Sequence, residues 1–393
     1  MAQTERISYK TLALDLLTRF RDLNASDLHL VPGRPPHFRV NGRLVPDGPF
    51  LPPGAVKTFL TQITDGDILA TLLDREEIDL SSSFRISEDE EIRFRLNAAL
   101  AGKMPFATLR RLLEIENTPF ELGLPEEFVS LCESHSHGVI FVTGTTGSGK
   151  STTLASILAY LLERKPFRVI TLEDPVEYVI PPGQGVISQR EIGQDTRSFA
   201  TALRAAMRQD PDVILVGEVR DAETAEALLA AAETGHLVFA TLHVGAASLV
   251  SDRIAGMFSS VEEGVAVKGR LANVLAGVLT QALVPSSRGR SLAWEFLAVG
   301  SEERELLHDD RQALLRERMR ESRTRLADSL ARLVAWGLCE EHVAKAYCNY
   351  HDEWDPQYME FLQGAPPPEP DPPPSVSVER EDRLEEEILY GCL

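Results

Sequence analysis

The sequence predicts an α/β protein whose larger domain is a parallel sheet with helices on both faces. Four mainly apolar runs alternate with helical patterns in the middle of the chain, at 139–142, 169–172, 213–216 and 237–240. Buried strands that are separated by helices are typical of a parallel sheet covered on both sides. Short strand patterns and one helix precede them, and helical patterns follow. We therefore expect a small α+β domain, then the α/β domain, then a helical region.

The composition is that of a folded protein, with 43% of the 393 residues apolar and 25% charged. Forty lysines and arginines stand against sixty aspartates and glutamates, which gives a net charge of −20. This charge argues against nucleic acid as a partner, because a protein that grips a phosphate backbone needs a basic surface. The four cysteines include no C-x-x-C pair, so neither a structural zinc site nor a disulfide framework is expected.

No targeting or membrane-spanning segment is expected. The first residues lead into an amphipathic helix pattern at 12–20 rather than into the apolar core of a signal peptide. The most apolar stretch, 264–284, is interrupted by Lys268 and Arg270, whereas a bilayer span needs about 20 mostly apolar residues. The sequence therefore predicts a cytoplasmic protein without a transmembrane segment.

Residues 1–115 are predicted to form the small α+β domain. Strand patterns flank the pair Asn41-Gly42, which favours a hairpin turn. In the strand pattern that contains Arg93 and Arg95, the alternation places both arginines on one face and apolar side chains on the other. Taken alone, this arginine face is interpreted as a solvated edge of the sheet.

The α/β domain is predicted at 126–298, after a turn-rich linker at 116–125. Its strongest motif is Gly-Thr-Thr-Gly-Ser-Gly-Lys-Ser at 144–151, a match to the G-x-x-x-x-G-K-[ST] phosphate loop between a strand and a helix. The glycines let successive N–H groups turn toward phosphates, and the helix N-terminus adds positive potential. The candidate nucleotide-binding residues are Gly144, Thr145, Thr146, Gly147, Ser148, Gly149, Lys150, Ser151 and Thr152.

Two side chains of this loop have specific expected roles. The Lys150 ammonium is expected to reach the β- and γ-phosphates, and the Ser151 hydroxyl is expected to join the shell of a Mg²⁺ ion. ATP and Mg²⁺ are therefore the expected ligands. The alternative, a glycine-rich turn with a chance lysine, is disfavoured by the flanking strand and helix.

Three further polar side chains follow predicted strands, and together with Lys150 they are the catalytic candidates. Parallel strands carry their C-terminal ends to the same edge as the phosphate loop. Glu218 is the candidate that positions or deprotonates the attacking water. Glu173 is the candidate that organises Mg²⁺ and water, with a helix-capping acidic turn as its structural alternative. His243 is expected to contact phosphate or Glu218, with an ordinary structural histidine as the alternative.

Gly217 departs from a common pattern, because many P-loop enzymes place a magnesium-binding aspartate at this position. The metal is therefore expected to depend on Ser151, Glu173, water and phosphate oxygens. His236 precedes its strand, at the opposite edge of the sheet, and is expected to make a structural hydrogen bond.

The last part of the chain is predicted to be helical at 299–362 and disordered at 363–393. Leu326, Leu330 and Leu333 recur at helical spacing. The final segment begins with a proline-rich run, which forbids regular structure, and continues as an acidic stretch. A solvated tail is favoured, and a short docking helix near its end is the alternative.

Several motifs together carry a resemblance to one protein family. They lie at 25–30 (Ala-Ser-Asp-Leu-His-Leu), 93–98, 144–151, 173–177, 217–221 and 234–243. With them the chain resembles the bacterial type II/IV secretion ATPases of the GspE superfamily, above all the type IV pilus retraction branch of PilT and PilU. The resemblance covers 9–343 and implies a PAS-like N-terminal domain followed by a RecA-like P-loop ATPase domain. It also implies that Arg93, Arg95 and Arg110 bind nucleotide.

The resemblance implies a function and partners as well. It implies a ring-shaped homo-hexamer that hydrolyses ATP to power type IV pilus retraction, and hence twitching motility, through an inner-membrane platform protein of the PilC kind. Such a motor works at the inner face of the cytoplasmic membrane, and a paralogous pilus ATPase is a further partner that the resemblance suggests. Because the chain has no tetracysteine insertion, it lies nearer the retraction branch than the extension and secretion branches.

Two departures from the family leave alternatives open. The retraction motif Ala-Ile-Arg-Asn-Leu-Ile-Arg corresponds here to Glu-Glu-Arg-Glu-Leu-Leu-His at 302–308, and its three carboxylates are predicted to repel the usual partner. The proline-rich acidic tail is the second departure. The alternatives are an ATPase of another secretion branch and a PilU-like accessory subunit with weak hydrolysis. The intact Lys150, Ser151 and Glu218 argue against a mere nucleotide-binding adaptor.

Overall fold

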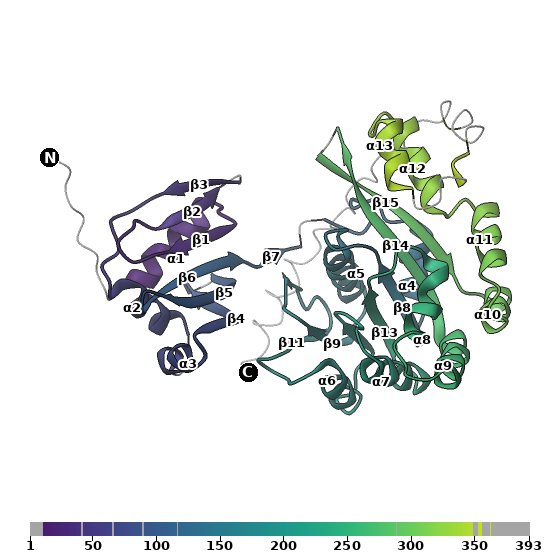
Figure 1. Ribbon diagram of the computed structural model, residues 1–393, viewed down its shortest axis with the longest axis horizontal. Helices are drawn as coiled ribbons and strands as arrows, with labels where there is room; N and C mark the ends of the chain where they lie inside the picture. Colours follow the sequence, from purple (N-terminus) through teal and green to yellow (C-terminus); the bar gives the residue numbers. More distant parts are fainter. Residues whose placement is uncertain are drawn as a thin grey trace, which may run out of the picture.

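A computed structural model of the chain describes residues 11–40, 42–64, 67–88, 90–115, 117–287, 289–348, 353–355 and 362. Its strands form two larger sheets, which Figure 1 shows as separate parts of the chain with β7 between them. The first, here called the N-terminal sheet, has the strand order β3-β2-β1-β6-β5-β4. The second, here called the central sheet, has the order β11-β9-β12-β13-β8-β14-β15.

All strand pairs of the N-terminal sheet are antiparallel, as expected of an α+β unit. Its elements are α1 (Leu12–Asp22), β1 (Asp27–Leu30), β2 (His37–Val40), β3 (Arg43–Pro46), α2 (Ala55–Ile63), α3 (Ile68–Arg75), β4 (Glu77–Arg85), β5 (Glu91–Ala101) and β6 (Met104–Arg111). The predicted hairpin is confirmed by the pairing of Val40 with Arg43, although Asn41 itself lies outside the described residues. The three helices and one face of the sheet share a single hydrophobic core.

The central sheet confirms the predicted α/β fold. Its elements are α4 (Glu126–Ser134), β8 (Gly138–Thr143), α5 (Lys150–Arg164), β9 (Arg168–Glu173), β11 (Val186–Glu191), α6 (Phe199–Ala206), β12 (Val213–Val216), α7 (Ala222–Glu233), β13 (Leu237–Leu242), the 3₁₀ helix η1 (Ala247–Leu249), α8 (Val250–Ala255), α9 (Val261–Val274), β14 (Leu275–Ser286) and β15 (Gly289–Ala298). The four predicted apolar runs are β8, β9, β12 and β13, and neighbouring strands from β11 to β14 are parallel.

Helices cover both faces of the central sheet, because both of its faces are apolar. Strands β8, β12 and β13 are buried along their full length. One core joins the sheet to α6, α7, α8 and α9, and the other joins it to α4 and α5 (Figure 1). This double cover is the arrangement that continuous apolar runs predict.

Strands β14 and β15 were not predicted as strands. The apolar stretch 264–284 changes in the middle from helix α9 to strand β14, and β15 then returns antiparallel to it. A continuous apolar run does not distinguish a buried strand from a buried helix, since both periodicities are satisfied by it. The second half of this stretch forms a strand because it pairs in parallel with β8.

The connection between the two sheets packs against the central sheet. Strand β7 (Leu113–Glu114) lies within the range predicted for the N-terminal domain but pairs with β10 (Tyr178–Val179). Ile115, Phe120 and Leu124 belong to the core beneath α4 and α5. The segment 116–125, expected as a linker, is therefore anchored over much of its described length.

In the described part of the chain, the helical elements that follow β15 include α10 (Ser301–His308), α11 (Gln312–Glu321), α12 (Leu326–Ala335) and α13 (Glu341–Tyr347). Leu326, Leu330 and Leu333 are buried, as their spacing predicts, and α12 packs on β15. The segment 363–393, predicted as a tail, lies outside the described residues. Within the described residues, none of the helices combines the length and the apolar character that crossing a membrane requires.

Helix α10 carries the altered retraction motif, and most of its charges are paired within the chain. Arg304 donates to the carbonyl oxygens of Ala272 and Asn273 at the end of α9. Arg318 of α11 forms an ion pair with Glu302 and lies 3.6 Å from Glu303. The acidic surface expected from the sequence is thus partly neutralised by a neighbouring helix.

Candidate active site

The phosphate loop joins β8 to α5, and its backbone has the shape that its glycines allow. Gly144, Gly147 and Gly149 have φ angles of 140°, 77° and 90°, in the region that side chains disfavour. A Cβ on Gly144 would lie 2.3 Å from the Gln281 carbonyl oxygen, and the Gln281 amide donates to the Ser148 carbonyl at 2.7 Å. The loop is therefore held from behind by β14, while the first N–H groups of α5 have no partner within the helix.

Lys150 folds back over this loop. Its Nζ donates to the carbonyl oxygens of Gly144 and Thr145 at 2.9 and 3.0 Å. Burial lowers the pKa of Lys150 below its ordinary value, while the carboxylates of Glu218 and Glu177 act in the opposite direction. The ammonium group is thus held at the mouth of the loop, where phosphate oxygens would arrive.

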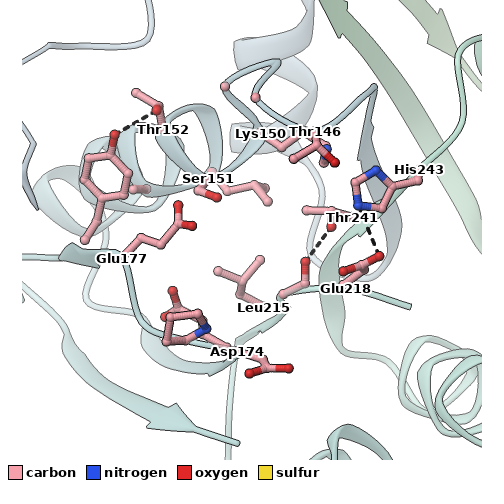
Figure 2. A pocket seen from close by; sticks show the side chains of 18 of the residues that line it. Thr146, Lys150, Ser151, Thr152, Asp174, Glu177, Leu215, Glu218, Thr241 and His243 are labelled. Carbon is pink, nitrogen blue, oxygen red and sulfur yellow. Dashed lines mark hydrogen bonds and ion pairs between the residues drawn. The ribbon is translucent and has the colours of Figure 1, made fainter. Parts of the chain in front are cut away.

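A cavity of about 530 Å³ lies in front of the loop and brings together the catalytic candidates predicted from the sequence. Figure 2 shows Lys150 and Ser151 on one side of it, with Glu218 and His243 on another. Glu173 and Thr152 also line this cavity. The strand ends and the loop meet at one edge of the sheet, as parallel strands require.

Basic side chains contact the Glu218 carboxylate from two directions. Arg220 Nε donates to Glu218 Oε2 at 2.7 Å, and His243 Nε2 lies 3.2 Å from Glu218 Oε1. Arg220 is also 3.7 Å from Asp174. Of the two contacts expected for His243, the one to Glu218 is present. His236 instead lies 3.0 Å from the Ala231 carbonyl oxygen, the structural hydrogen bond that its position predicts.

The structure gives a reason for glycine at position 217. A Cβ there would lie 3.0 Å from the Leu172 carbonyl oxygen and 3.2 Å from the Glu173 Cα, so any side chain would require the end of β9 to shift by a few tenths of an ångström. Thr241 Oγ1 donates to the Gly217 carbonyl at 2.5 Å (Figure 2). Gly217 is thus closely packed between the ends of β9 and β12.

Glu173 is held by its own neighbours. Its Oε1 accepts from Thr171 Oγ1 at 2.5 Å and from Gln189 Nε2 at 3.1 Å. Burial raises the pKa of Glu173 above its ordinary value. Among the described residues no three His, Cys, Asp or Glu side chains form a metal-binding group. Ser151 and Glu173, the two residues expected to hold Mg²⁺, both line this cavity, and their role toward a metal ion stays a prediction.

Two of the three arginines expected to bind nucleotide lie at a cavity that shares residues with the first one. Arg95 and Arg110 line a second cavity of about 630 Å³, which they share with Thr152 and Tyr178. Arg93 lines a different cavity. Although Arg93 and Arg95 share a strand, the structure does not bring Arg93 to the same place.

Both neighbouring arginines are paired with aspartates of the N-terminal sheet. Arg95 makes two hydrogen bonds to Asp79, at 2.7 and 2.6 Å. Arg110 Nε donates to the buried Asp27 at 2.9 Å. These contacts fix each guanidinium group on the face of the sheet that borders the second cavity.

Sequence reasoning missed four residues of the site. Arg220 lies within the motif at 217–221, but no role was predicted for it. The Glu177 carboxylate points into the cavity near Ser151 (Figure 2), and the residue was predicted only as part of the acidic segment 173–177. Tyr178 meets the Thr152 hydroxyl at 2.8 Å, and Gln281 supports the loop. Gln281 lies on a strand that the sequence did not reveal, so no signal pointed to it.

A lysine-bearing phosphate loop at the end of a parallel strand, faced by a glutamate at the end of a nearby strand, defines the class of P-loop ATPases. The chain belongs to the family described as "Type II/IV secretion system protein", whose model matches residues 79–326. It is an ATPase of the PilT/PilU-like group within the GspE superfamily.

Comparisons with known proteins agree with this family. The chain is 42% identical over 276 residues to YggR of Escherichia coli K12, an uncharacterised protein, covering 70% of this chain and 82% of that one. It is 39% identical over 300 residues to the type IV pilus retraction ATPase PilT of Pseudomonas aeruginosa, covering 76% and 86%. A crystal structure of the pilus retraction motor PilT with bound ADP superposes with a TM-score of 0.78 at 36% identity, covering 88% of this chain and 98% of that one.

Proposed function

We propose that this chain is the ATP-hydrolysing motor of type IV pilus retraction. The observation that carries the proposal is the meeting of Lys150, Glu218 and His243 in one cavity, on a fold shared with PilT. The names of the similar proteins supply the link to the pilus. In this role the chain forms a homo-hexameric ring at the inner face of the cytoplasmic membrane and acts on a platform protein of the PilC kind.

Each residue of the cavity has a task in hydrolysis. The N–H groups of the loop and the Lys150 ammonium bind the phosphates of ATP. Glu218 holds the attacking water and accepts its proton, while His243 orients the Glu218 carboxylate. Ser151 would hold a Mg²⁺ ion bound with the nucleotide, and that ion would neutralise part of the phosphate charge.

Arg95 and Arg110 stabilise charge on the nucleotide in this proposal. Both border the cavity that continues from Thr152, and both are oriented by aspartates. Arginines of this kind contribute about 10³ to 10⁵ in phosphoryl-transfer rate. Arg93, in its different cavity, has no such task in a single chain.

A second candidate function is a PilU-like accessory subunit with weak hydrolysis, or a motor of another secretion branch. The altered α10 motif favours this candidate, because in this chain part of that helix is committed to an ion pair with α11. Two measurements separate the candidates. A purified chain that hydrolyses ATP as a ring of six, together with loss of twitching when its gene is deleted, supports the retraction motor. A ring without turnover, or hydrolysis with unchanged twitching, contradicts it.

A further inference from the structure

A row of polar residues crosses the N-terminal sheet on one face. Asp27 on β1 lies directly opposite Arg110 on β6, and Arg110 lies opposite Arg95 on β5. Arg95 in turn lies opposite Ser81 on β4. Directly opposed residues of an antiparallel sheet share a face and are in mutual reach. The row therefore carries both nucleotide-facing arginines and ends at Ser81, on an edge strand.

Glu191 meets the end of this row from the other sheet. It is the last residue of β11, the edge strand of the central sheet, and is only 6% exposed. Its carboxylate accepts from the Ser81 hydroxyl at 2.5 Å and from the Ser81 N–H at 3.3 Å. Gln194, which donates to Glu191 at 2.6 Å, also donates to the Ser81 carbonyl at 3.3 Å. One buried carboxylate thus ties the two sheets together.

The same carboxylate holds the wall of the nucleotide cavity. Glu191 Oε2 accepts the backbone N–H of Val176 at 3.2 Å, and Val176 lies between Glu173 and Glu177 of the acidic segment. Burying a carboxylate is costly unless donors surround it, and here four donors do so. An apolar contact would hold the sheets together without that cost. It would not, however, fix the orientation of one sheet relative to the other.

We infer that Glu191 is a positioning residue, which fixes the N-terminal sheet so that Arg95 and Arg110 face the nucleotide. It acts through Ser81, because Ser81 lies opposite Arg95 in the register of β4 and β5. The inference rests on the proposed role of these arginines in ATP hydrolysis. It adds a residue that does not line the cavity of Lys150 and Glu218.

The test compares Ser81→Ala and Glu191→Ala with Ser83→Ala in the full chain. Ser83 is the matched control, since it lies on the same strand and face but bonds to Glu91 of its own sheet at 2.7 Å. We expect Ser81→Ala to raise the KM for ATP about tenfold with a smaller change in kcat, the effect of one lost hydrogen bond to a charged group. Ser81→Thr, which keeps the hydroxyl, should restore the wild-type KM.

A second measurement does not depend on activity. Hydrogen–deuterium exchange at the Ser81 and Val176 amides should quicken about tenfold in Glu191→Ala, because both amides donate to this carboxylate. Unchanged exchange at both amides would overturn the contact. Faster exchange with an unchanged KM, or an equal rise of KM in Ser83→Ala, would overturn the positioning role. If the wild-type chain does not hydrolyse ATP, the proposed function fails and the positioning role fails with it, while exchange still decides the contact.

Discussion

At the scale of single residues, Glu218 is the side chain that we propose as the general base for hydrolysis. Its two carboxylate oxygens are held by Arg220 and His243, so the group has one orientation toward the cavity. Such fixation matters because a general base works only within hydrogen-bond reach of the proton it accepts. The pair Glu218–His243 is therefore the part of the site where a small chemical change should have the largest effect.

Replacing Glu218 by glutamine should leave ATP bound but not hydrolysed. Glutamine keeps the size of the side chain and loses its basicity, so we expect hydrolysis to fall by about 10² to 10⁴. Single-turnover hydrolysis and nucleotide binding measure the two effects separately. Glu223→Gln is the control, because Glu223 is an exposed residue of α7 paired with Arg204. Normal hydrolysis in Glu218→Gln would show that another group positions the water.

Lys150→Ala should abolish turnover and leave the fold intact. The substitution removes the positive charge that the loop holds over its own carbonyl groups. Steady-state hydrolysis and far-UV circular dichroism check the two parts of this prediction. Lys57→Ala, on the surface of α2, is the matched change at a distance. Wild-type rates in Lys150→Ala would place the nucleotide elsewhere.

Glu295 should make stability depend on pH. It is 1% exposed on β15, it accepts the Ala247 N–H at 2.7 Å, and burial raises its pKa above the ordinary value. A carboxyl whose pKa is higher in the folded protein binds its proton more tightly there, so its contribution to stability falls as pH rises through the window above about 4.5. The free energy of unfolding of wild type minus that of Glu295→Gln should therefore be larger at about pH 5 than at about pH 8. Urea denaturation at both pH values measures this difference in unfolding free energy. An equal difference at the two pH values would contradict the raised pKa of Glu295.

At the scale of secondary-structure elements, two side chains of α10 contact the end of α9: Arg304, and His308, whose Nε2 lies 3.0 Å from Asn273 Oδ1. Arg304 reaches the last carbonyl groups of α9, immediately before β14 begins. Cations near a helix C-terminus are favourable because they meet unpaired carbonyl groups. The junction lies at the edge of the central sheet opposite the phosphate loop, since β14 starts beside the start of β8.

Arg304→Ala should therefore lower stability and spare hydrolysis. We expect a loss of about 1 kcal/mol for the missing hydrogen bonds, visible as a fall in Tm of a few degrees. The rate of ATP hydrolysis should change little, because the site lies at the other edge of the sheet. Thermal unfolding and a steady-state assay of the same preparation check both. A large loss of hydrolysis at unchanged Tm would mean that α10 acts on the site.

What the sequence could predict at this scale depends on the kind of signal. The strands β8, β12 and β13 were predictable because their apolar runs are short and bounded by turns. Strand β14 was not, because it continues the apolar pattern of α9 without a break. The pairing of Arg318 with Glu302 was equally hidden, since it joins two helices whose packing no local pattern encodes.

The site shows the same division. The phosphate loop, Glu218 and His243 were predictable from motifs whose chemistry is local to a strand end. The Glu191 contact was not, because it depends on how two sheets meet. Arg93 is the opposite case. Its place on a strand was predicted correctly, but it lines a different cavity from Arg95 and Arg110.

At the scale of the whole molecule, the proposed ring predicts a mass of six chains of 43.4 kDa each. Mass photometry with a non-hydrolysable ATP analogue should show this species, and the Lys150→Ala variant should show whether nucleotide binding is needed to form it. A protein that stays monomeric under these conditions, yet hydrolyses ATP at full rate, would contradict the ring.

Complementation tests the altered surface of α10 in the cell. We expect the unmodified chain to restore twitching only in part to a strain that lacks its own retraction ATPase. Because Arg318 pairs with Glu302 and Glu303, the exposed Glu305 is the main remaining departure, and Glu305→Asn should improve the rescue. Full rescue by the unmodified chain would contradict a specialised partner.

The anchored connection between the two sheets has a mechanical consequence. The backbone that leaves the N-terminal sheet is hydrogen-bonded to β10 at Tyr178, and Tyr178 holds the hydroxyl of Thr152 in the first turn of α5. A force that pulls the two sheets apart would load these bonds together with the Glu191–Ser81 contact. Strain between the sheets would then reach Thr152 at the start of α5, so a force on the chain would act on the loop that is expected to bind nucleotide.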